Sequence, residues 1–416
     1  MTDTEGKQLK KGNRTLLPVV AVLLLAVVSI AALAFAKLMP KQAEPPAEPV
    51  AVVEPSSSEP EPPPPEPEPE PEPSVVRFMA AGDNLIHDNI YKQANARAGG
   101  NGFDFSVPYE MIEPVFADAD LSFINQETII AESVFELSGY PLFNSPEAVG
   151  NRIAGMGFDV VCISNNHMFD KGEKGLIAAL DFWQAKEDIL TIGAWRQEED
   201  MKQPLLYEKN GITFGFVPIT EHTNGLKLPK DTPLRFIRSD EYDLMKEQVE
   251  LAKQHSDFVV VSIHWGTENS TELNDNQLYL AQMFADWGVD LVLGHHSHTL
   301  QPMEWRTGKE GNRTLVVYSL GNFISSMLNP QNMLGGILDI DITMEEGEKP
   351  EITRAKMIPI VTQYDTINRR EVRIYPFSEY TDELVAAHGM KERHEVFSID
   401  YMQGIIDKNI PEEFLN

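Results

Sequence analysis

The stretch Leu291-Val292-Leu293-Gly294-His295-His296-Ser297-His298 joins a short apolar run to three histidines. An apolar run of this length, followed directly by glycine, predicts a buried strand over Leu291–Leu293. Residues i and i+2 of an extended segment point the same way, so we expect the rings of His296 and His298 to face one site and His295 to point elsewhere. Imidazole is a common ligand of transition metals, and the stretch therefore predicts a metal-binding position at a strand end.

Apolar runs that end in polar residues recur along the chain and predict further strands. They cover Val75–Ala81, Leu121–Ile124, Val160–Ser164, Ile212–Val217, Phe258–Ile263 and Leu315–Ser319. Amphipathic stretches between them predict helices over Tyr109–Phe116, Pro146–Met156, Glu173–Ala185, Glu241–His255 and Asn276–Trp287. This alternation favours an α/β fold with much parallel pairing. Two further strands are expected at Ile337–Thr343 and Ile352–Val361.

Polar residues just past the expected strand ends are candidates for a functional site, because open α/β sheets bind ligands there. Six of the ten histidines lie at such positions, beside Asp, Glu and Asn. Imidazole and carboxylate donors suit Zn, Fe, Mn or Ni, and several donors of mixed hardness suggest two ions. A purely structural polar cluster is the alternative. The candidates are Asp83, Asn84, His87, Asn125, Glu127, Asn166, His167, Asp170, His264, Glu268, His295, His296, His298 and Asn322.

The composition excludes several other classes of protein. The 416 residues carry a net charge of −30, and this acidity argues against nucleic acid as a main partner. The single cysteine, Cys162, excludes both a disulfide framework and a Cys-rich zinc site. Because Cys162 lies inside an apolar run, we expect it in the core and not at a reactive site.

The N-terminal region predicts a membrane anchor. Residues Leu16–Ala36 are apolar or small and uncharged, and about 20 such residues cross a bilayer core. Four basic residues precede the run within residues 1–15, which predicts a cytoplasmic N-terminal tail and a single-pass protein of the cell membrane with an extracytoplasmic body. A cleaved signal peptide is the alternative, because Ala34-Phe35-Ala36 fits a small-x-small cleavage site.

A linker rich in Pro and Glu follows the apolar run. This composition favours extended polyproline II conformation and self-repulsion, so we expect a disordered spacer over residues 37–74. The chain would then consist of a tail (1–15), an anchor (16–36), the linker (37–74), an α/β domain (75–345) and a C-terminal extension packed on that domain (346–416).

Six motifs together resemble the bacterial capsule-synthesis proteins of the CapA type, which take part in poly-γ-glutamate biosynthesis. The motifs are Gly82-Asp83, Asn125-x-Glu127, Ser164-Asn165-Asn166-His167, His264-Trp265-Gly266, Gly294-His295-His296-Ser297-His298 and Ser319-Leu320-Gly321-Asn322-Phe323. This family is related to calcineurin-like metallophosphoesterases. The resemblance therefore implies a four-layer α/β/β/α sandwich with a dinuclear centre of divalent ions such as Mn, Fe or Zn.

The resemblance also implies roles for individual residues. His167 would be the proton donor of a metal-assisted hydrolysis, and Glu127 would bridge the two ions. The six metal ligands would be Asp83, Glu127, Asn166, His264, His296 and His298. The residues that surround them or contact substrate would be Asn84, His87, Asn125, Asp170, Glu268, His295 and Asn322. Phosphoesterases carry Asp-x-His in the first motif, whereas Leu85 stands two residues after Asp83 here, so one ion would lack a ligand.

Two functions remain open at this point. The first is an exported metallohydrolase that acts on phosphoester or polymer linkages at the cell envelope. The second is a non-catalytic scaffold or anchoring subunit of a membrane complex for capsule polymer. Either function would bring the chain into contact with the membrane, with poly-γ-glutamate or another anionic envelope polymer, and with membrane synthesis subunits.

Overall fold

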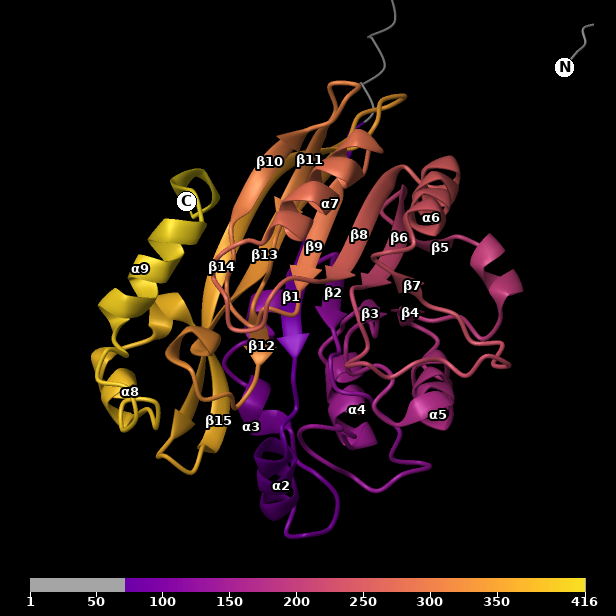
Figure 1. The fold of residues 1–416 in the computed structure, drawn as a ribbon. Helices are drawn as coiled ribbons and strands as arrows, with labels where there is room; N and C mark the ends of the chain where they lie inside the picture. Colours follow the sequence, from indigo (N-terminus) through magenta and orange to yellow (C-terminus); the bar gives the residue numbers. More distant parts are fainter. Residues whose placement is uncertain (1–71, 416) are drawn as a thin grey trace, which may run out of the picture. The chain divides into compact units, whose positions relative to one another are not determined.

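Two β-sheets form the centre of residues 72–415, the part of the chain that this computed structural model describes (Figure 1). The expected N-terminal tail, the expected anchor and nearly all of the expected linker lie outside the described residues. Within residues 72–415, no helix has both the length and the apolar character that spanning a bilayer requires.

The first sheet contains eight strands. They are β1 (Ser74–Asn84), β2 (Leu121–Asn125), β3 (Val160–Cys162), β4 (Leu190–Ile192), β12 (Asn322–Ile324), β13 (Leu334–Met344), β14 (Glu351–Asp365) and β15 (Arg370–Pro376). Their order is β15-β14-β13-β1-β2-β3-β4, and β12 pairs with the end of β1. The strands β1 to β4 are parallel, whereas β13, β14 and β15 are antiparallel to their neighbours.

The second sheet contains seven strands. They are β5 (Leu205–Lys209), β6 (Ile212–Thr220), β7 (Ile237–Arg238), β8 (Phe258–His264), β9 (Leu291–His295), β10 (Met303–Thr307) and β11 (Arg313–Val317). Their order is β10-β11-β9-β8-β6-β5, with β7 beside β6. Because β6, β8, β9 and β11 run parallel, their carboxyl ends reach the same end of the sheet.

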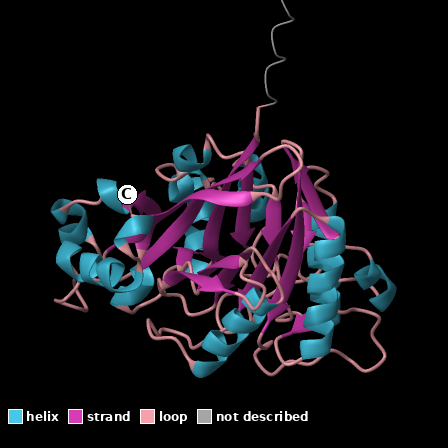
Figure 2. Ribbon diagram, turned by 90° about the horizontal axis from the view of Figure 1, so that it is seen from above, coloured by secondary structure: helices cyan, strands magenta, loops and turns pink. Residues whose placement is uncertain are grey.

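Helices lie on both sides of the strands, as Figure 2 shows. The α-helices are α2 (Asp88–Arg97), α3 (Ser106–Tyr109), α4 (Glu147–Gly155), α5 (Gly172–Gln184), α6 (Tyr242–His255), α7 (Asp275–Asp286), α8 (Asp382–Ala387) and α9 (Ile399–Asn409). Short 3-10 helices are η1 (Glu113–Phe116), η2 (Glu198–Lys202), η3 (Pro330–Met333), η4 (Phe377–Glu379) and η5 (Glu412–Phe414). The mixed α/β class predicted from the sequence is confirmed.

The central strands β8 and β9 of the second sheet are buried on both faces, as parallel strands usually are. Along β8, Val260 belongs to the large apolar cluster shared with the first sheet, whereas Val259 and Val261 pack with α6 and α7 on the other face. Direct contacts join the two sheets. The ring of Phe78 on β1 stacks on Phe214 of β6 at a centroid distance of 6.3 Å. The predicted core position of Cys162 is confirmed, because this thiol is buried and accepts a hydrogen bond from Ser262 Oγ at 3.4 Å.

The strongly apolar strands lie where the sequence predicts them, whereas one helix does not. The helix expected over Tyr109–Phe116 is wrong, because α3 ends at Tyr109 and a separate 3-10 turn follows. Pro114 has no amide hydrogen for an interior helical bond, so a continuous helix is disfavoured there. The sequence analysis also missed α2 and the short strands β4, β5, β7, β10, β12 and β15.

The expected boundary at residue 345 falls between two adjacent strands of one sheet. Thr343 of β13 pairs with Glu351 of β14, and β15 pairs with β14 in turn. Residues 346–376 therefore complete the first sheet. The helices α8 and α9 then lie at the edge formed by β14 and β15 (Figure 1), where Phe397 and Ile406 are buried.

Replacing Phe78 by Ala should lower the free energy of unfolding by about 3–5 kcal/mol, because it removes a buried ring between the sheets. Urea denaturation measures this change. Val75→Ala is the matched control on the same strand, since Val75 is 43% exposed and should change stability little. A loss below about 1 kcal/mol for Phe78→Ala would contradict the assigned packing.

Candidate metal centre

The carboxyl ends of strands from both sheets bring the predicted metal ligands together. Asp83 lies at the end of β1, in register with Asn125 of β2. His264 ends β8 and pairs with His295 of β9. We call the six predicted ligands the donor cluster, and all of them are buried: Asp83, Glu127, Asn166, His264, His296 and His298.

The backbone around Asp83 is fixed by a close approach of two chain segments. The amide of Asp83 donates to the carbonyl oxygen of Gly321 at 2.9 Å. A Cβ atom at Gly82 would lie only 2.0 Å from that oxygen, so only glycine fits at this position. The short strand β12, which begins at Asn322, then aligns with the end of β1.

The Asp83 carboxylate is held by bonds to both of its oxygens. Asn125 Nδ2 donates to Oδ1 at 2.7 Å, and the His296 amide donates to Oδ2 at 3.3 Å. His298 Nδ1 lies 3.1 Å from Oδ2. Burial acts to raise the pKa of Asp83, but the neighbouring rings of His295 and His298 hold it well below the usual range. Asp83 is therefore a carboxylate at neutral pH.

Glu127 is buried without a hydrogen-bond partner on either oxygen among the residues described. Its Oε1 lies 3.7 Å from His264 Nε2 and 3.6 Å from His298 Nε2. Burial, together with the nearby Asp83 charge, raises the pKa of Glu127 well above its usual value. A buried carboxyl group of this kind requires a cation or a proton.

His298 lies between the two carboxyl groups and responds to both. Burial acts to lower the pKa of His298, but the Glu127 charge and the bond to Asp83 raise it to about 10. In the protein without an ion, a proton on His298 therefore supplies the positive charge that Asp83 and Glu127 require.

The other three residues of the donor cluster are Asn166, His264 and His296, and they meet at Nε2 of His264. His264 Nε2 lies 3.0 Å from Asn166 Oδ1 and 3.1 Å from His296 Nδ1. Burial is the main cause that lowers the pKa of His264 well below the usual value and that of His296 to about 3. Both rings are neutral at pH 7 and can offer lone pairs to a metal ion.

The residues present fit a divalent cation. Asp83, Glu127 and His298 offer ligand atoms that all lie within 4.8 Å of one another. The oxygens of Glu127 and Nδ1 of His264 are buried polar atoms for which residues 72–415 provide no hydrogen-bond partner. Carboxylate, amide and imidazole donors suit borderline and hard divalent ions.

His167, the predicted proton donor, lies beside the cluster and is oriented by a carboxylate. Its Nδ1 lies 2.8 Å from Asp170 Oδ2, and the Phe143 amide donates to the same oxygen at 2.7 Å. The Phe143 ring packs edge-on against the imidazole, with a centroid distance of 4.7 Å. The bond to Asp170 fixes the tautomer with hydrogen on Nδ1 and leaves Nε2 for exchange of a proton.

The prediction that His295 points elsewhere is wrong. His295 Nδ1 lies 3.4 Å from Asp83 Oδ1, and the ring stacks on Phe123 at 5.9 Å. The reason is that the extended segment ends at His295, since His296 and His298 have φ angles of 89° and 56°. The i, i+2 rule therefore does not apply there, although the rings of His296 and His298 do lie close, 6.1 Å apart.

Of the remaining candidates, Asn322 contacts the donor cluster directly, whereas Asn84 bonds to a residue beside it. Asn322 Oδ1 lies 3.1 Å from His298 Nδ1, and Asn84 Nδ2 donates to Gln126 Oε1 at 2.6 Å. His87 lies farther out, where its Nδ1 accepts from the Ser326 amide at 3.3 Å. Burial lowers the pKa of His87 to about 3. Glu268 lies in an exposed loop.

The sequence analysis missed the loop that follows β6. The His222 ring lies 4.9 Å from that of His296. Asn224 lies next to both strand-end residues of β3, since its Oδ1 accepts from Asn166 Nδ2 at 3.3 Å and its Nδ2 lies 3.4 Å from His167 Nδ1. The expected strand stopped at Val217, whereas β6 continues to Thr220. Placing the strand end correctly would have identified His222 as a seventh strand-end histidine.

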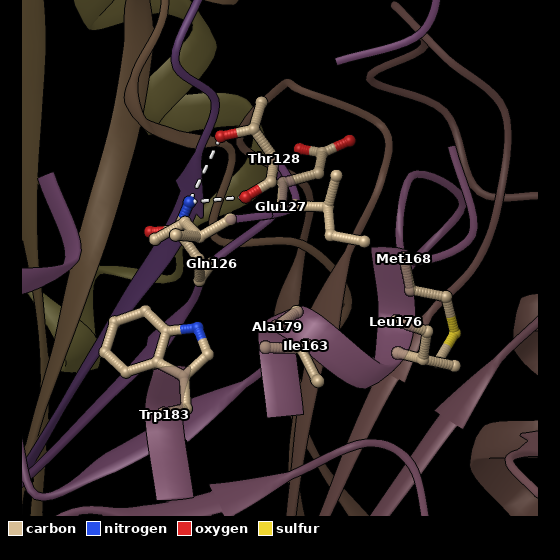
Figure 3. Close-up of a pocket in the computed structure, with 10 residues that line it drawn as sticks. Gln126, Glu127, Thr128, Ile163, Met168, Leu176, Ala179 and Trp183 are labelled. Carbon is tan, nitrogen blue, oxygen red and sulfur yellow. Dashed lines mark hydrogen bonds between the residues drawn. The ribbon is translucent and has the colours of Figure 1, made fainter. Parts of the chain in front are cut away.

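A small cavity lies on the other side of Glu127 and does not offer a substrate site. Its volume is about 10 Å³, and apolar side chains such as Leu176 and Ala179 form most of its wall (Figure 3). Figure 3 also shows that the Gln126 amide is bonded to Thr128 at this wall. Such a volume holds roughly one water molecule.

Comparisons with known proteins agree with the motifs. The family described as "Bacterial capsule synthesis protein PGA_cap" matches residues 77–327, which is more than half of the chain. "PGA biosynthesis protein CapA" of Bacillus subtilis (strain 168) is 32% identical over 221 residues, 52% of this chain and 56% of that protein. "Capsule biosynthesis protein CapA" of Bacillus anthracis is 32% identical over 173 residues, 40% of each chain. The chain thus spans about half the length of the curated relatives it matches.

Among solved structures, the chain is similar to the NAD nucleotidase NadN of Haemophilus influenzae. The similarity covers 81% of this chain and 67% of that chain, with a TM-score of 0.43 and 12% sequence identity.

The metal-free protein should lose stability as the pH falls below about 6.5, the ordinary value for histidine. The folded protein keeps His264 and His296 neutral, whereas the unfolded chain takes up protons on both, so acid favours unfolding. Each such histidine lowers the free energy of unfolding by up to about 1.4 kcal/mol per pH unit between pH 6.5 and its folded pKa. Urea denaturation of chelator-treated protein at pH 7.5, 6.5, 5.5 and 4.5 measures the slope.

His296→Gln should reduce this slope by about one proton. The control is His255→Gln, since His255 is exposed on α6 and remote in sequence from the cluster. Equal slopes for His296→Gln and the unmodified protein would show that His296 is not held neutral by burial.

Proposed function

The chain belongs to the bacterial capsule synthesis protein family PGA_cap, and from this membership we propose that it is a membrane-anchored extracytoplasmic protein that serves synthesis or export of a poly-γ-glutamate capsule and carries a metal-dependent hydrolase site. The proposed reaction is of the phosphoesterase type, as the relation to calcineurin-like enzymes implies. The two facing sheets with helices outside them are compatible with the four-layer sandwich of those enzymes.

One observation carries the proposal of a metal-dependent site. Strand ends from both sheets bring together two carboxyl groups, three imidazoles and one amide, and the oxygens of Glu127, one of the two carboxyl groups, have no hydrogen-bond partner among residues 72–415. A structural polar cluster would pair these atoms with one another, because buried polar groups without partners are costly. The unpaired atoms favour a bound cation over a structural role.

The cluster divides into two groups that share Glu127. Asp83 and His298 would hold one ion, and the second would be held by Asn166, His264 and His296. Divalent ions in these positions would supply Lewis acidity and lower the pKa of a water molecule. Mn, Fe and Zn all suit this donor set.

His167 would donate a proton to the leaving group. The bond to Asp170 holds Nδ1, so Nε2 is the atom available for proton transfer. The Phe143 ring lies against the imidazole and excludes water from one side of it. The amide oxygen of Asn166, the preceding residue, points toward His264. Of these two adjacent residues, Asn166 would therefore hold an ion and His167 would donate the proton.

One observation favours the second function, a scaffold or anchoring subunit without catalysis. Leu85 is buried and apolar at the position where phosphoesterases have a histidine ligand. An ion held by fewer protein ligands binds more weakly, and a cluster with a single ion could be structural.

Replacing His167 by Ala should separate catalysis from metal binding. As a proton donor that is not a ligand, it should leave metal content unchanged and slow hydrolysis of a phosphodiester by about 10²–10⁴-fold. Asn166→Ala should instead reduce metal content first, because it removes a ligand oxygen. Metal analysis of the purified full chain and turnover of bis(p-nitrophenyl) phosphate measure both.

Asp170→Asn is the matched variant for orientation, and it should lower turnover while metal content stays the same. A cellular assay tests the scaffold function. Normal surface polymer with His167→Ala, together with loss of polymer with Asn166→Ala, would contradict the hydrolase proposal and favour a structural metal. Full retention of polymer and metal in both variants would contradict the site itself.

A reporter fused after Asn416 should be active outside the cytoplasm, because the basic residues before Leu16 keep the N-terminus inside. Alkaline phosphatase activity in intact cells measures this. The control is a fusion after Gly12, ahead of the apolar run, which should be inactive. A C-terminus that proteases cannot reach in spheroplasts would contradict the proposed topology, whereas a mature N-terminus near Lys37 would indicate cleavage with export intact.

A further inference from the structure

His295 is a buried histidine for which residues 72–415 provide no hydrogen-bond partner. It is 1% exposed, and neither Nδ1 nor Nε2 makes a hydrogen bond within this part of the chain. Most buried side-chain polar atoms have a partner, because leaving one without a hydrogen bond costs free energy. The other histidines next to the two carboxyl groups differ from it. His264 and His298 each have a hydrogen-bond partner on at least one ring nitrogen.

The ring cannot turn away to find a partner elsewhere. It stacks on Phe123 of β2 with an interplanar angle of 18°. The backbone of His295 pairs with His264 across β8 and β9, and its carbonyl oxygen accepts from the Trp265 amide at 3.3 Å. The imidazole is therefore fixed by both sheets in the position it occupies.

A carboxylate oxygen lies near this ring at a distance typical of two ligands on one ion. His295 Nδ1 lies 3.4 Å from Asp83 Oδ1. Nitrogen and oxygen ligands at about 2.1 Å from a tetrahedral ion lie roughly 3.4 Å apart. Nδ1 of His298 lies at a similar distance from the same carboxylate group, 3.1 Å from Asp83 Oδ2.

The group around Asp83 is one donor short of a four-ligand site. Asp83, Glu127 and His298 provide three ligand atoms, and the side chain of Leu85 cannot provide a fourth. We propose that His295 is the fourth protein ligand of the ion held by Asp83, Glu127 and His298. The inference rests on the proposed metal site, and it places on β9 a ligand that the metallophosphoesterases carry in their first motif.

The competing role is orientation, in which Nδ1–H of His295 donates to Asp83 Oδ1. That oxygen already accepts from Asn125 Nδ2 at 2.7 Å, so the carboxylate is oriented without His295. A glutamine at this position can still donate to Asp83 but is a poor metal ligand, and the two roles therefore predict different results.

The test is metal stoichiometry of the full chain purified in detergent, with Mn²⁺ and Zn²⁺ as probes. The unmodified protein should bind two equivalents. His295→Gln should lose one equivalent, with at least 100-fold weaker binding at that position. The control is His222→Gln, which removes a half-buried ring next to His296 and should retain both equivalents.

A second variant distinguishes loss of a ligand from misfolding. His295→Ala opens space beside Phe123, and free imidazole should restore the lost equivalent if the ring is a ligand. The thermal unfolding of metal-free His295→Gln should match that of the metal-free unmodified protein. Retention of two equivalents by His295→Gln overturns the ligand role while leaving the metal site in place. Absence of metal from the unmodified protein overturns both this inference and the proposed hydrolase function.

Discussion

Two buried carboxyl groups that require positive charge are the constraint on which the site depends. Asp83 and Glu127 are both fully buried, and His298 touches both. A carboxylate in the protein interior is costly unless a cation pairs with it. Without an ion, His298 meets this requirement by keeping its proton, as its pKa of about 10 shows. A divalent ion would displace that proton, so metal binding and protonation must compete at this ring.

The two-sheet fold explains how such a costly group of residues can exist. Each residue of the donor cluster follows a strand whose own side chains are buried in one of two apolar clusters. The stability gained from those strands offsets the cost of gathering polar groups at their ends. Because the strands come from both sheets, neither sheet alone contains the cluster. The contact between Phe78 and Phe214, and the packing of His295 on Phe123, therefore set the position of the donors as well as the stability of the core.

The sequence predicted the positions of the donor residues better than their orientations. The apolar runs of β1, β2, β3, β8 and β9 are unambiguous, and the residues after them do meet at one end of the molecule. The roles of these residues stay predictions. The prediction for His295 failed because the chain leaves the extended conformation at His296, whose φ is positive, so the alternation of side chains does not continue past His295. His222 was missed because the expected strand stopped at Val217, whereas β6 continues to Thr220.

The acidity of the chain gives the metal a second role if the substrate is an anionic polymer. A net charge of −30 repels a polyanion, and the cluster itself contributes two carboxyl groups at its centre. Two unit charges 4 Å apart interact by about 4 kcal/mol in a partly shielded protein environment. Replacing the proton of His298 by divalent ions changes the local charge from near neutral to positive, and an anionic group is then attracted. Metal and anionic substrate should therefore each raise the affinity for the other, because linkage between two binding events is reciprocal.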